Sequence, residues 1–352
     1  MRRLALLLCL PLLLLPLAED ARAADWRDAL DAQIERIDRA TPGELGVYVK
    51  RLNGGETYRH GAERFWYLGS MTKVPIAIAV LQQVDAGKLK LSDSVELQDA
   101  DRIDVSRVVR ERTGRRYTVD ALLDRMLKDS DNTAANMLIR TVGEDTVQRS
   151  AAQALGTQGF KRITNFATMR RDVYAEIHPS ARGLPNTALV QVADAPLGPG
   201  RVRAVQRALK LKDGELQART IDEAYDRYYR HDINAATLDA YGAMLEKLVR
   251  GELLQPASLQ RLYAAMKLGT FTNHRLQAGL PRSEPFIHKT GTQYERACHA
   301  GVLRPQDRGA DAVVVAVCAA GMDEHKDVDA IFQQVGRAVA QTALRPQQSA
   351  AR

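Results

Sequence analysis

A serine and a lysine lie three residues apart in the run Ser70-Met71-Thr72-Lys73. A serine hydroxyl is a weak nucleophile at neutral pH and needs a base within hydrogen-bond reach. Because side chains three residues apart share one face of a helix, Lys73 can approach Ser70 there. A lysine that is desolvated near another cation can lose its proton near neutral pH. The spacing therefore predicts a nucleophilic serine at the start of a helix, where free N–H groups favour an oxyanion.

A second run, Ser130-Asp131-Asn132, carries groups that suit the same chemistry. The hydroxyl can relay a proton to a leaving nitrogen, and the amide can hold a substrate amide through its donor and its acceptor. Asp131 can tie the loop down by accepting from backbone N–H groups. An Asx-rich turn between two helices is the ordinary alternative, just as a helix N-cap is for Ser70.

A third run, Lys289-Thr290-Gly291-Thr292, follows an apolar stretch that is typical of a strand. Lys289 supplies a positive field and a hydroxyl can bind a carboxylate, while Gly291 lets a ligand lie along the strand edge. An ordinary strand end is the alternative here. The three runs together, in this order, favour one shared active site over three unrelated turns.

The elements that must position these runs follow from hydrophobic periodicity and turn residues. A helix is expected after Gly69 and Ser70, with Pro75 in its first turn and its end at Gly87. Strands are expected near both ends of the chain and helices between them. The expected strands are 45–49, a second after the turn at 53–55, 286–289, 300–303 and 312–317; the further helices are 25–40, 118–128, 133–141, 238–249 and 328–343. This order predicts an α+β fold: an antiparallel sheet of N- and C-terminal strands packed with helices, plus an all-helical part.

The N-terminal stretch is typical of a secretory signal. Arg2 and Arg3 precede an apolar run over 4–17, and Ala21-Arg22-Ala23 has the form of a cleavage site. We therefore expect a signal peptide at 1–23, a mature chain from near Ala24, and a periplasmic or secreted protein; an uncleaved anchor is the alternative. The rest is expected to be one catalytic domain at 24–345, with an irregular, proline-containing insert at about 177–232 and a disordered tail at 346–352.

Composition limits the partners. The 352 residues carry a formal charge of +7, but basic residues are interleaved with acids and have no aromatic companions, so we expect no nucleic-acid binding. Histidines and cysteines show no metal-ligand spacing, and we expect no metal and no cofactor. We expect a monomer.

Two cysteines remain after removal of the signal segment, Cys298 and Cys318. They lie symmetrically about residue 308, inside the loop expected between the last two strands. Antiparallel partners keep such symmetry, so these cysteines should face each other across a hairpin. A disulfide is possible in an oxidising compartment.

The three runs resemble those of the class A β-lactamases and penicillin-binding proteins. The resemblance rests on residues 69–91, 130–143, 234–262 and 288–292, and covers about 25–345 apart from the insert. It implies that Ser70 is acylated, with Lys73 as base, Ser130 as proton shuttle and Asn132 binding the amide. The implied carboxylate site is Lys289, Thr290 and Thr292, and the implied oxyanion hole is the backbone N–H groups of Ser70 and Thr292.

The chain departs from that family at two places. The family's β-lactamases carry E-x-x-L-N, whose glutamate activates the deacylating water, and the stretch 163–179 has no such motif. Glu176 is the glutamate present there and is the candidate substitute. The family's arginine beyond K-T-G is displaced, and Arg296 is the nearest one. The missing glutamate predicts that fast acylation is followed by slow release, unless Glu176 takes its place.

Four functions fit the sequence. The first is a β-lactamase-like hydrolase acting on β-lactams. The second is a penicillin-binding D,D-peptidase acting on the D-Ala-D-Ala end of peptidoglycan stem peptides. A non-catalytic envelope binding module and a serine glutaminase are the others, and the intact S-D-N and K-T-G runs argue against both.

Overall fold

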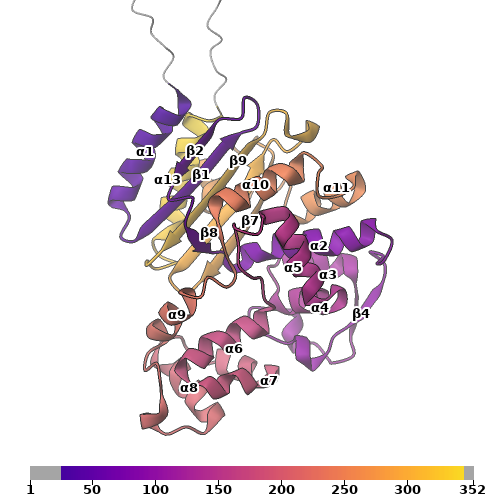
Figure 1. Cartoon of the computed structure of the whole chain (residues 1–352), viewed down its shortest axis with the longest axis vertical. Coiled ribbons are helices and arrows are strands. Elements are labelled where there is room, and N and C mark those ends of the chain that lie inside the picture. Colours follow the sequence, from indigo (N-terminus) through magenta and orange to yellow (C-terminus); the bar gives the residue numbers. More distant parts are fainter. Residues whose placement is uncertain (1–24, 345–352) are drawn as a thin grey trace, which may run out of the picture.

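A computed structural model describes residues 25–344 and shows an α+β fold (Figure 1). Its centre is a five-stranded antiparallel sheet in the order β2-β1-β9-β8-β7. The N-terminal β1 pairs with the C-terminal β9, so the two ends of the chain meet as the sequence predicts. The expected signal peptide at 1–23 and the tail at 346–352 lie outside the described residues. The strands are β1 Glu44–Arg51, β2 Thr57–His60, β7 Phe286–Gln293, β8 Arg296–Leu303 and β9 Val313–Ala320.

Alternation along the strands creates two cores, one on each face of the sheet. Val315 and Val317 of β9 point to one face, and Ala316 and Cys318 point to the other. Helices α1 (Trp26–Ala40) and α13 (Val328–Gln341) cover the first face and α10 (Leu238–Val249) packs on the second (Figure 1). A strand shifted by one residue would exchange these faces, so burial on both sides sets the register.

A helical part lies beyond the second face and holds the catalytic helix α2 (Lys73–Asp85). This helix is apolar nearly all round and is buried by its neighbours. The surrounding helices are α3 Val119–Leu127, α4 Asn132–Val142, α5 Glu144–Leu155 and α11 Pro256–Ala265. The remaining small elements are β3 Phe65–Tyr67, β6 Ala235–Thr237, β4 Ser94–Glu96, β5 Arg116–Thr118, α12 Leu276–Gly279, and the 3₁₀ turns η1 Gly69–Thr72, η2 Asp99–Asp101, η3 Val108–Arg110 and η6 Asp307–Gly309.

The insert at 177–232 is mostly helical, which corrects the expectation of an irregular segment. Three of its four prolines stand at helix starts instead of interrupting helices: Pro179 opens η4, Pro185 precedes α7, and Pro199 is the first residue of α8, while Pro196 lies in the segment between α7 and α8. Proline suits a first helical position because its missing N–H would have no intrahelical partner there. The insert follows α6 (Phe166–Ile177) and comprises η4 Pro179–Gly183, α7 Asn186–Ala193, α8 Pro199–Leu209, η5 Asp213–Glu215 and α9 Ile221–Tyr229.

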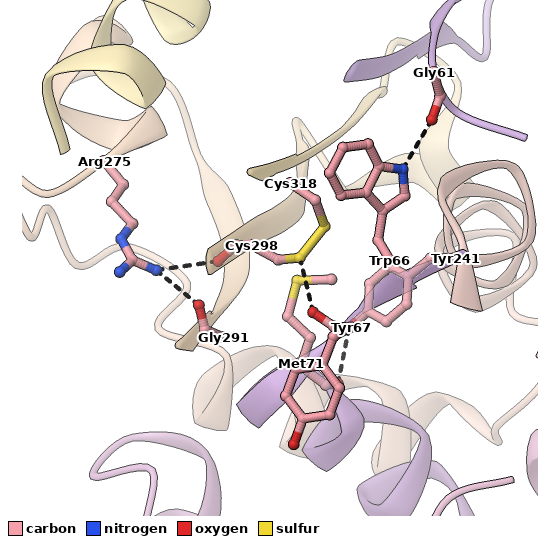
Figure 2. The surroundings of a disulfide bond; sticks show 9 residues. All are labelled: Gly61, Trp66, Tyr67, Met71, Tyr241, Arg275, Gly291, Cys298 and Cys318. Carbon is pink, nitrogen blue, oxygen red and sulfur yellow. Dashed lines mark hydrogen bonds between the residues drawn. A yellow bond between two sulfur atoms is a disulfide. The ribbon is translucent and has the colours of Figure 1, made fainter. Parts of the chain in front are cut away.

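Cys298 of β8 and Cys318 of β9 face each other as the sequence predicts, and they form the disulfide that the sequence left open (Figure 2). The two residues are direct partners in the antiparallel register, and their Cα atoms are 4.1 Å apart. Cys298 also pairs with Gly291 on its other side. The bridge therefore lies one strand away from the K-T-G run. Within residues 25–344, no helix has the length and apolar character needed to cross a membrane.

Candidate active site

The structure brings Ser70 and Lys73 into contact. Lys73 Nζ lies 2.8 Å from Ser70 Oγ, as the three-residue spacing across η1 and the start of α2 predicts. The Lys73 side chain is fully buried, and Nζ also lies 2.6 Å from Asn132 Oδ1 and 2.8 Å from the carbonyl of Ser130. Burial lowers the pKa of Lys73 well below its ordinary value, and the charge of Lys289 lowers it further. A neutral amine at this place can take the proton of Ser70.

Ser130 lies between the two lysines. Its Oγ is 3.2 Å from Lys73 Nζ and 3.1 Å from Lys289 Nζ. The backbone of Ser130 is held at φ +59°, a conformation that non-glycine residues rarely adopt. A hydroxyl placed in this way connects the base to the position of a leaving group.

Asp131 holds this turn in place. Its carboxylate caps α4 at Ala134 N and accepts from the backbone N–H groups of Arg107 and Val108. It also accepts from the hydroxyl of Ser106 at 2.6 Å. The carboxylate thus ties the loop before η3 to the S-D-N turn, as the sequence predicts.

The K-T-G run ends strand β7 beside the nucleophile. Gly291 is essential for this contact, because a Cβ there would come 1.9 Å from the carbonyl oxygen of Leu68. A Cβ on Gly69, which has φ +54°, would come 2.9 Å from Thr292 N. The start of η1 and the end of β7 therefore touch, and the backbone N–H groups of Ser70 and Thr292 are brought to one place.

Lys289 is buried in this strand and contacts the carbonyl of Thr290 at 2.9 Å. Burial, followed by the charges of Lys267 and Arg275, lowers the pKa of Lys289 to about 7. Its charge is therefore sensitive to pH in the neutral range.

An arginine that the sequence does not single out reaches the end of β7. Arg275 donates to Thr292 Oγ1 and to the carbonyl of Gly291, each at 2.9 Å, and it pairs with Asp329 at 3.2 Å. Figure 2 shows its guanidinium directed at the carbonyls of Gly291 and Cys298. Arg296, the nearest arginine in the sequence, instead lies over the ring of Tyr229 at 4.5 Å. Arg275, and not Arg296, is thus the arginine that contacts Thr292, a residue of the predicted carboxylate site.

Glu176 is not directed at the nucleophile. It lies at the end of α6, and its carboxylate is 3.1 Å from His231 Nε2. Asp172, the other carboxylate in residues 163–180, lies 3.9 Å from Arg182. These contacts leave neither carboxylate in the role of deacylation base.

A phenyl ring occupies the place next to Lys73. Phe166, the first residue of α6, has its ring centroid 4.4 Å from Lys73 Nζ. The backbone N–H of Phe166 donates to Asn136 Oδ1 at 2.9 Å, which fixes the start of the helix. A benzene ring cannot accept a proton from water, so the stretch that should supply a base covers the lysine with an apolar group.

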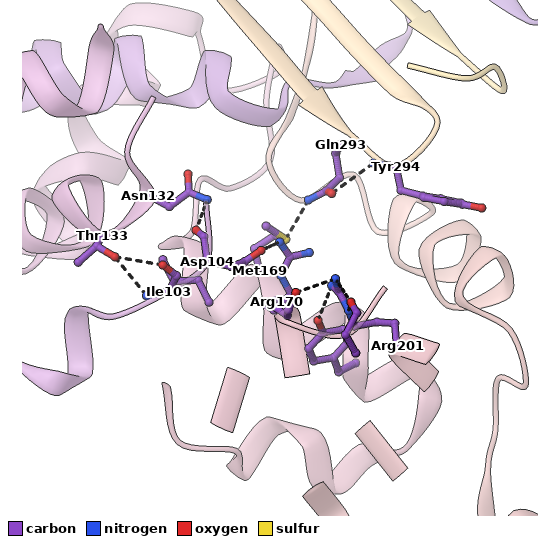
Figure 3. Close-up of polar contacts among 12 residues, drawn as sticks. Ile103, Asp104, Asn132, Thr133, Met169, Arg170, Arg201, Gln293 and Tyr294 are labelled. Carbon is purple, nitrogen blue, oxygen red and sulfur yellow. Dashed lines mark hydrogen bonds and ion pairs between the residues drawn. The ribbon is translucent and has the colours of Figure 1, made fainter. Parts of the chain in front are cut away.

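Asn132 is held from both ends of its amide. Oδ1 faces Lys73, and Nδ2 donates to the carbonyl of Asp104 at 3.0 Å (Figure 3). Its second N–H remains available to a substrate carbonyl. The Asp104 carboxylate in turn pairs with the buried Arg170, whose Nη1 donates to Tyr225 Oη at 2.7 Å.

No group of three or more histidine, cysteine or acidic side chains lies close enough to hold a metal ion within residues 25–344. A cavity of about 500 Å³ opens beside Thr292, between the loop at 104–110 and the insert. Of the predicted site residues, Thr292 lines this cavity, which extends from there towards α7 and α8.

Comparisons with known proteins agree with this geometry. A model described as the Beta-lactamase enzyme family matches residues 29–181 and 185–343. Beta-lactamase L2 of Stenotrophomonas maltophilia is 26% identical, over 94% of this chain and 92% of that enzyme. A beta-lactamase of Rhodobacter capsulatus is 32% identical over a shorter match, 33% of this chain and 40% of the relative.

Solved structures share the fold at low identity. A beta-lactamase from Xanthomonas campestris superimposes with a TM-score of 0.65 at 23% identity, covering 91% of this chain and 99% of that one. A PBP-A variant, solved as an acyl-enzyme with penicillin G, has a TM-score of 0.64 at 20% identity and covers 89% and 96%.

Proposed function

Because the chain belongs to the β-lactamase enzyme family, we propose that it forms an acyl-enzyme on Ser70 with β-lactams and hydrolyses that intermediate slowly. Acylation is supported by the 2.8 Å contact between Ser70 Oγ and Lys73, a buried lysine whose pKa is lowered. Slow release of the acyl group is supported by the ring of Phe166 beside that lysine, because the ring cannot accept a proton from water.

Acylation follows from the positions of the side chains. Lys73 takes the proton of Ser70 while Oγ attacks the lactam carbonyl, and the backbone N–H groups of Ser70 and Thr292 stabilise the oxyanion. When the lactam C–N bond breaks, Ser130 gives its proton to the nitrogen and receives one from Lys73. Lys289 and Thr292, supported by Arg275, bind the substrate carboxylate.

A D,D-peptidase is the second candidate, and Phe166 is the observation that favours it. The acylation steps are the same when the bond cleaved is the peptide bond of a D-Ala-D-Ala terminus on a stem peptide. A peptidase that reacts with penicillin as a substrate mimic does not need a water-activating glutamate. A lasting adduct is then the normal outcome.

The compartment and the oligomeric state are also proposals. The mature chain is expected to act in the periplasm, as a monomer, after cleavage near Ala23. The disulfide between Cys298 and Cys318 supports an oxidising compartment. Fractionation of the native host, with N-terminal sequencing of the mature chain and size-exclusion chromatography, tests all three points.

Intact-mass analysis over time after addition of benzylpenicillin tests the function. We expect an adduct of one penicillin that forms quickly and disappears slowly, and no adduct on the Ser70→Ala variant. Immediate turnover without an adduct favours an efficient β-lactamase. The absence of both an adduct and turnover would indicate a binding module. Release of D-alanine from a D-Ala-D-Ala peptide in parallel identifies the peptidase.

A further inference from the structure

The cavity beside Thr292 is built by two parts of the chain that the sequence separates widely. The loop at 104–110 forms one side, and α7 with the start of α8 forms the other. Gln293, the last residue of β7, and Tyr294, which follows it, also line the cavity (Figure 3). The volume of about 500 Å³ is in the range of small-ligand sites.

Charged side chains at the floor of the cavity already have partners. Arg170 is paired with Asp104. Arg201, also buried, donates to the carbonyls of Ala193 and Ala195 at 2.8 to 3.0 Å. Arg170 therefore joins the loop to the insert through Asp104 and Tyr225, and Arg201 joins α8 to the end of α7. Neither guanidinium group is free to recognise an ionic ligand.

Charged side chains at the mouth are paired as well. Arg110 and Asp194 face each other at 3.9 Å from opposite sides. Glu324 accepts from the backbone N–H of Glu295 at 2.9 Å and lies 3.6 Å from His325 Nε2. The charges that line the cavity thus compensate one another, which favours a neutral occupant.

Two large apolar side chains at the cavity are left open to solvent. Within residues 25–344, the strongly exposed large hydrophobic residues are Val105, at 65%, and Leu197, at 48%, and both line this cavity. Val105 stands on the loop and Leu197 on the insert. Exposed apolar groups gathered at one cavity are typical of a site that an apolar ligand covers.

The backbone at Val105 supports a functional role. Its φ of +56° is unfavourable for a β-branched residue, and such strained positions cluster at binding sites. The Val105 carbonyl accepts from the backbone N–H of Asn132 at 3.1 Å. The residue therefore directly adjoins the group that would hold the substrate amide.

We propose that this cavity binds an apolar side group on the acyl side of the substrate, and that Val105 and Leu197 determine the preference for it. The proposal rests on the proposed function, because that function places the substrate carboxylate at Lys289 and Thr292 and its amide at Asn132. A group attached beyond that amide enters the space between Val105 and Leu197. The insert, which the class A pattern lacks, thereby supplies one wall of the substrate site.

Binding to the Ser70→Ala protein tests the proposal without requiring acylation. Calorimetry would compare benzylpenicillin, whose side-chain amide carries a benzyl group, with N-formyl-6-aminopenicillanic acid, which keeps the amide and has no apolar side group. We expect benzylpenicillin to bind more tightly. Leu197→Asp should weaken benzylpenicillin binding by roughly tenfold and leave binding of the N-formyl compound unchanged, because the apolar contact is lost and a charge is introduced. Val105→Asn, which tolerates the positive φ, should act in the same direction.

The matched control is Thr187→Asp, an exposed residue of α7 that does not line the cavity. It should change neither affinity. Equal affinities for the two ligands, or equal losses for both in Leu197→Asp, would overturn the proposal. If the side-group preference is present but the protein with Ser70 forms no penicillin adduct, the proposed function fails and the side-group site stands.

Discussion

Single residues set the protonation of the site through burial. Lys73 and Lys289 are both buried, and they share Ser130 Oγ at 3.2 and 3.1 Å. Two ammonium groups so close together favour the loss of one proton, and Lys73, whose pKa is well below its ordinary value, is the one placed to act as base. Lys73 thus serves in proton transfer, and Lys289 supplies the positive charge.

The pH dependence of acylation follows from this assignment. The active free enzyme carries a neutral Lys73 and a charged Lys289. Because the pKa of Lys289 is about 7, the second-order rate constant for acylation should fall as pH rises above about 7. Lys289→Arg keeps its charge at all accessible pH values and should abolish this alkaline fall. Stopped-flow measurement of the acylation rate constant between pH 6 and 9 tests both proteins. A rate constant of the wild type that does not change over this range would contradict the role of a charged Lys289.

Phe166 provides a test of slow deacylation. Phe166→Glu places a carboxylate beside Lys73 and should accelerate release of the acyl group, towards the roughly 10²–10⁴-fold that a general base contributes. Phe166→Gln has a similar shape and cannot accept the proton, so it should remain slow. The decay of the adduct, followed by mass spectrometry, distinguishes the two. Equal decay in both variants would show that the ring does not limit release.

Elements bring distant runs together through close backbone contacts. η1 and β7 meet because glycine stands at positions 69 and 291, where a Cβ would overlap the facing backbone. On the far side of β7, strands β8 and β9 are joined by the disulfide. The catalytic strand is therefore supported by a covalently closed hairpin.

Opening this disulfide should lower stability without changing the fold. Cys298 and Cys318 enclose a loop of about 20 residues, and closing a loop of this size contributes about 3 kcal/mol in the chain-entropy description. We expect a reducing agent to lower the melting temperature of the wild type. The double variant Cys298→Ala, Cys318→Ala should melt lower at the outset and show no response to the reductant. An unchanged wild-type melting temperature would exclude a stabilising role.

At the scale of the whole molecule, one polar network connects the sheet, the helical part and the insert. Arg170 on α6 contacts Asp104 of the loop (Figure 3) and donates to Tyr225 of α9. Tyr225 Oη lies 3.2 Å from Gln293 Oε1 at the end of β7. Because the carbonyl of Asp104 also holds Asn132, this network couples the position of the insert to the active site.

Breaking the buried pair should destabilise the protein strongly. Arg170→Met leaves the Asp104 carboxylate without its partner, and such a loss typically costs about 3–5 kcal/mol. Adding Asp104→Asn should restore part of the stability, because the unpaired charge is then removed. Urea unfolding measures both variants. Arg39→Met, which removes an exposed pair with Glu35, is the control and should cost less than about 1 kcal/mol.

The sequence by itself determined the chemistry, the fold class and the position of the two cysteines opposite each other. Ser70 and Lys73 are three residues apart, so local helix geometry alone brings them together. The pairing of Cys298 with Cys318 follows from hairpin symmetry, which is also local. Alternating apolar residues and turn signals at both ends of the chain predict a sheet made from those ends.

Only the tertiary structure decided which groups surround that chemistry. Phe166 reaches Lys73 from 93 positions away, and Arg275 reaches Thr292 although it precedes the K-T-G run. Neither contact has a fixed spacing that a sequence pattern can reveal. The prolines and charged residues of the insert predict an irregular segment, yet Pro199 begins a helix. Through-space contacts of this kind depend on how the helices pack, and packing is a property of the complete fold.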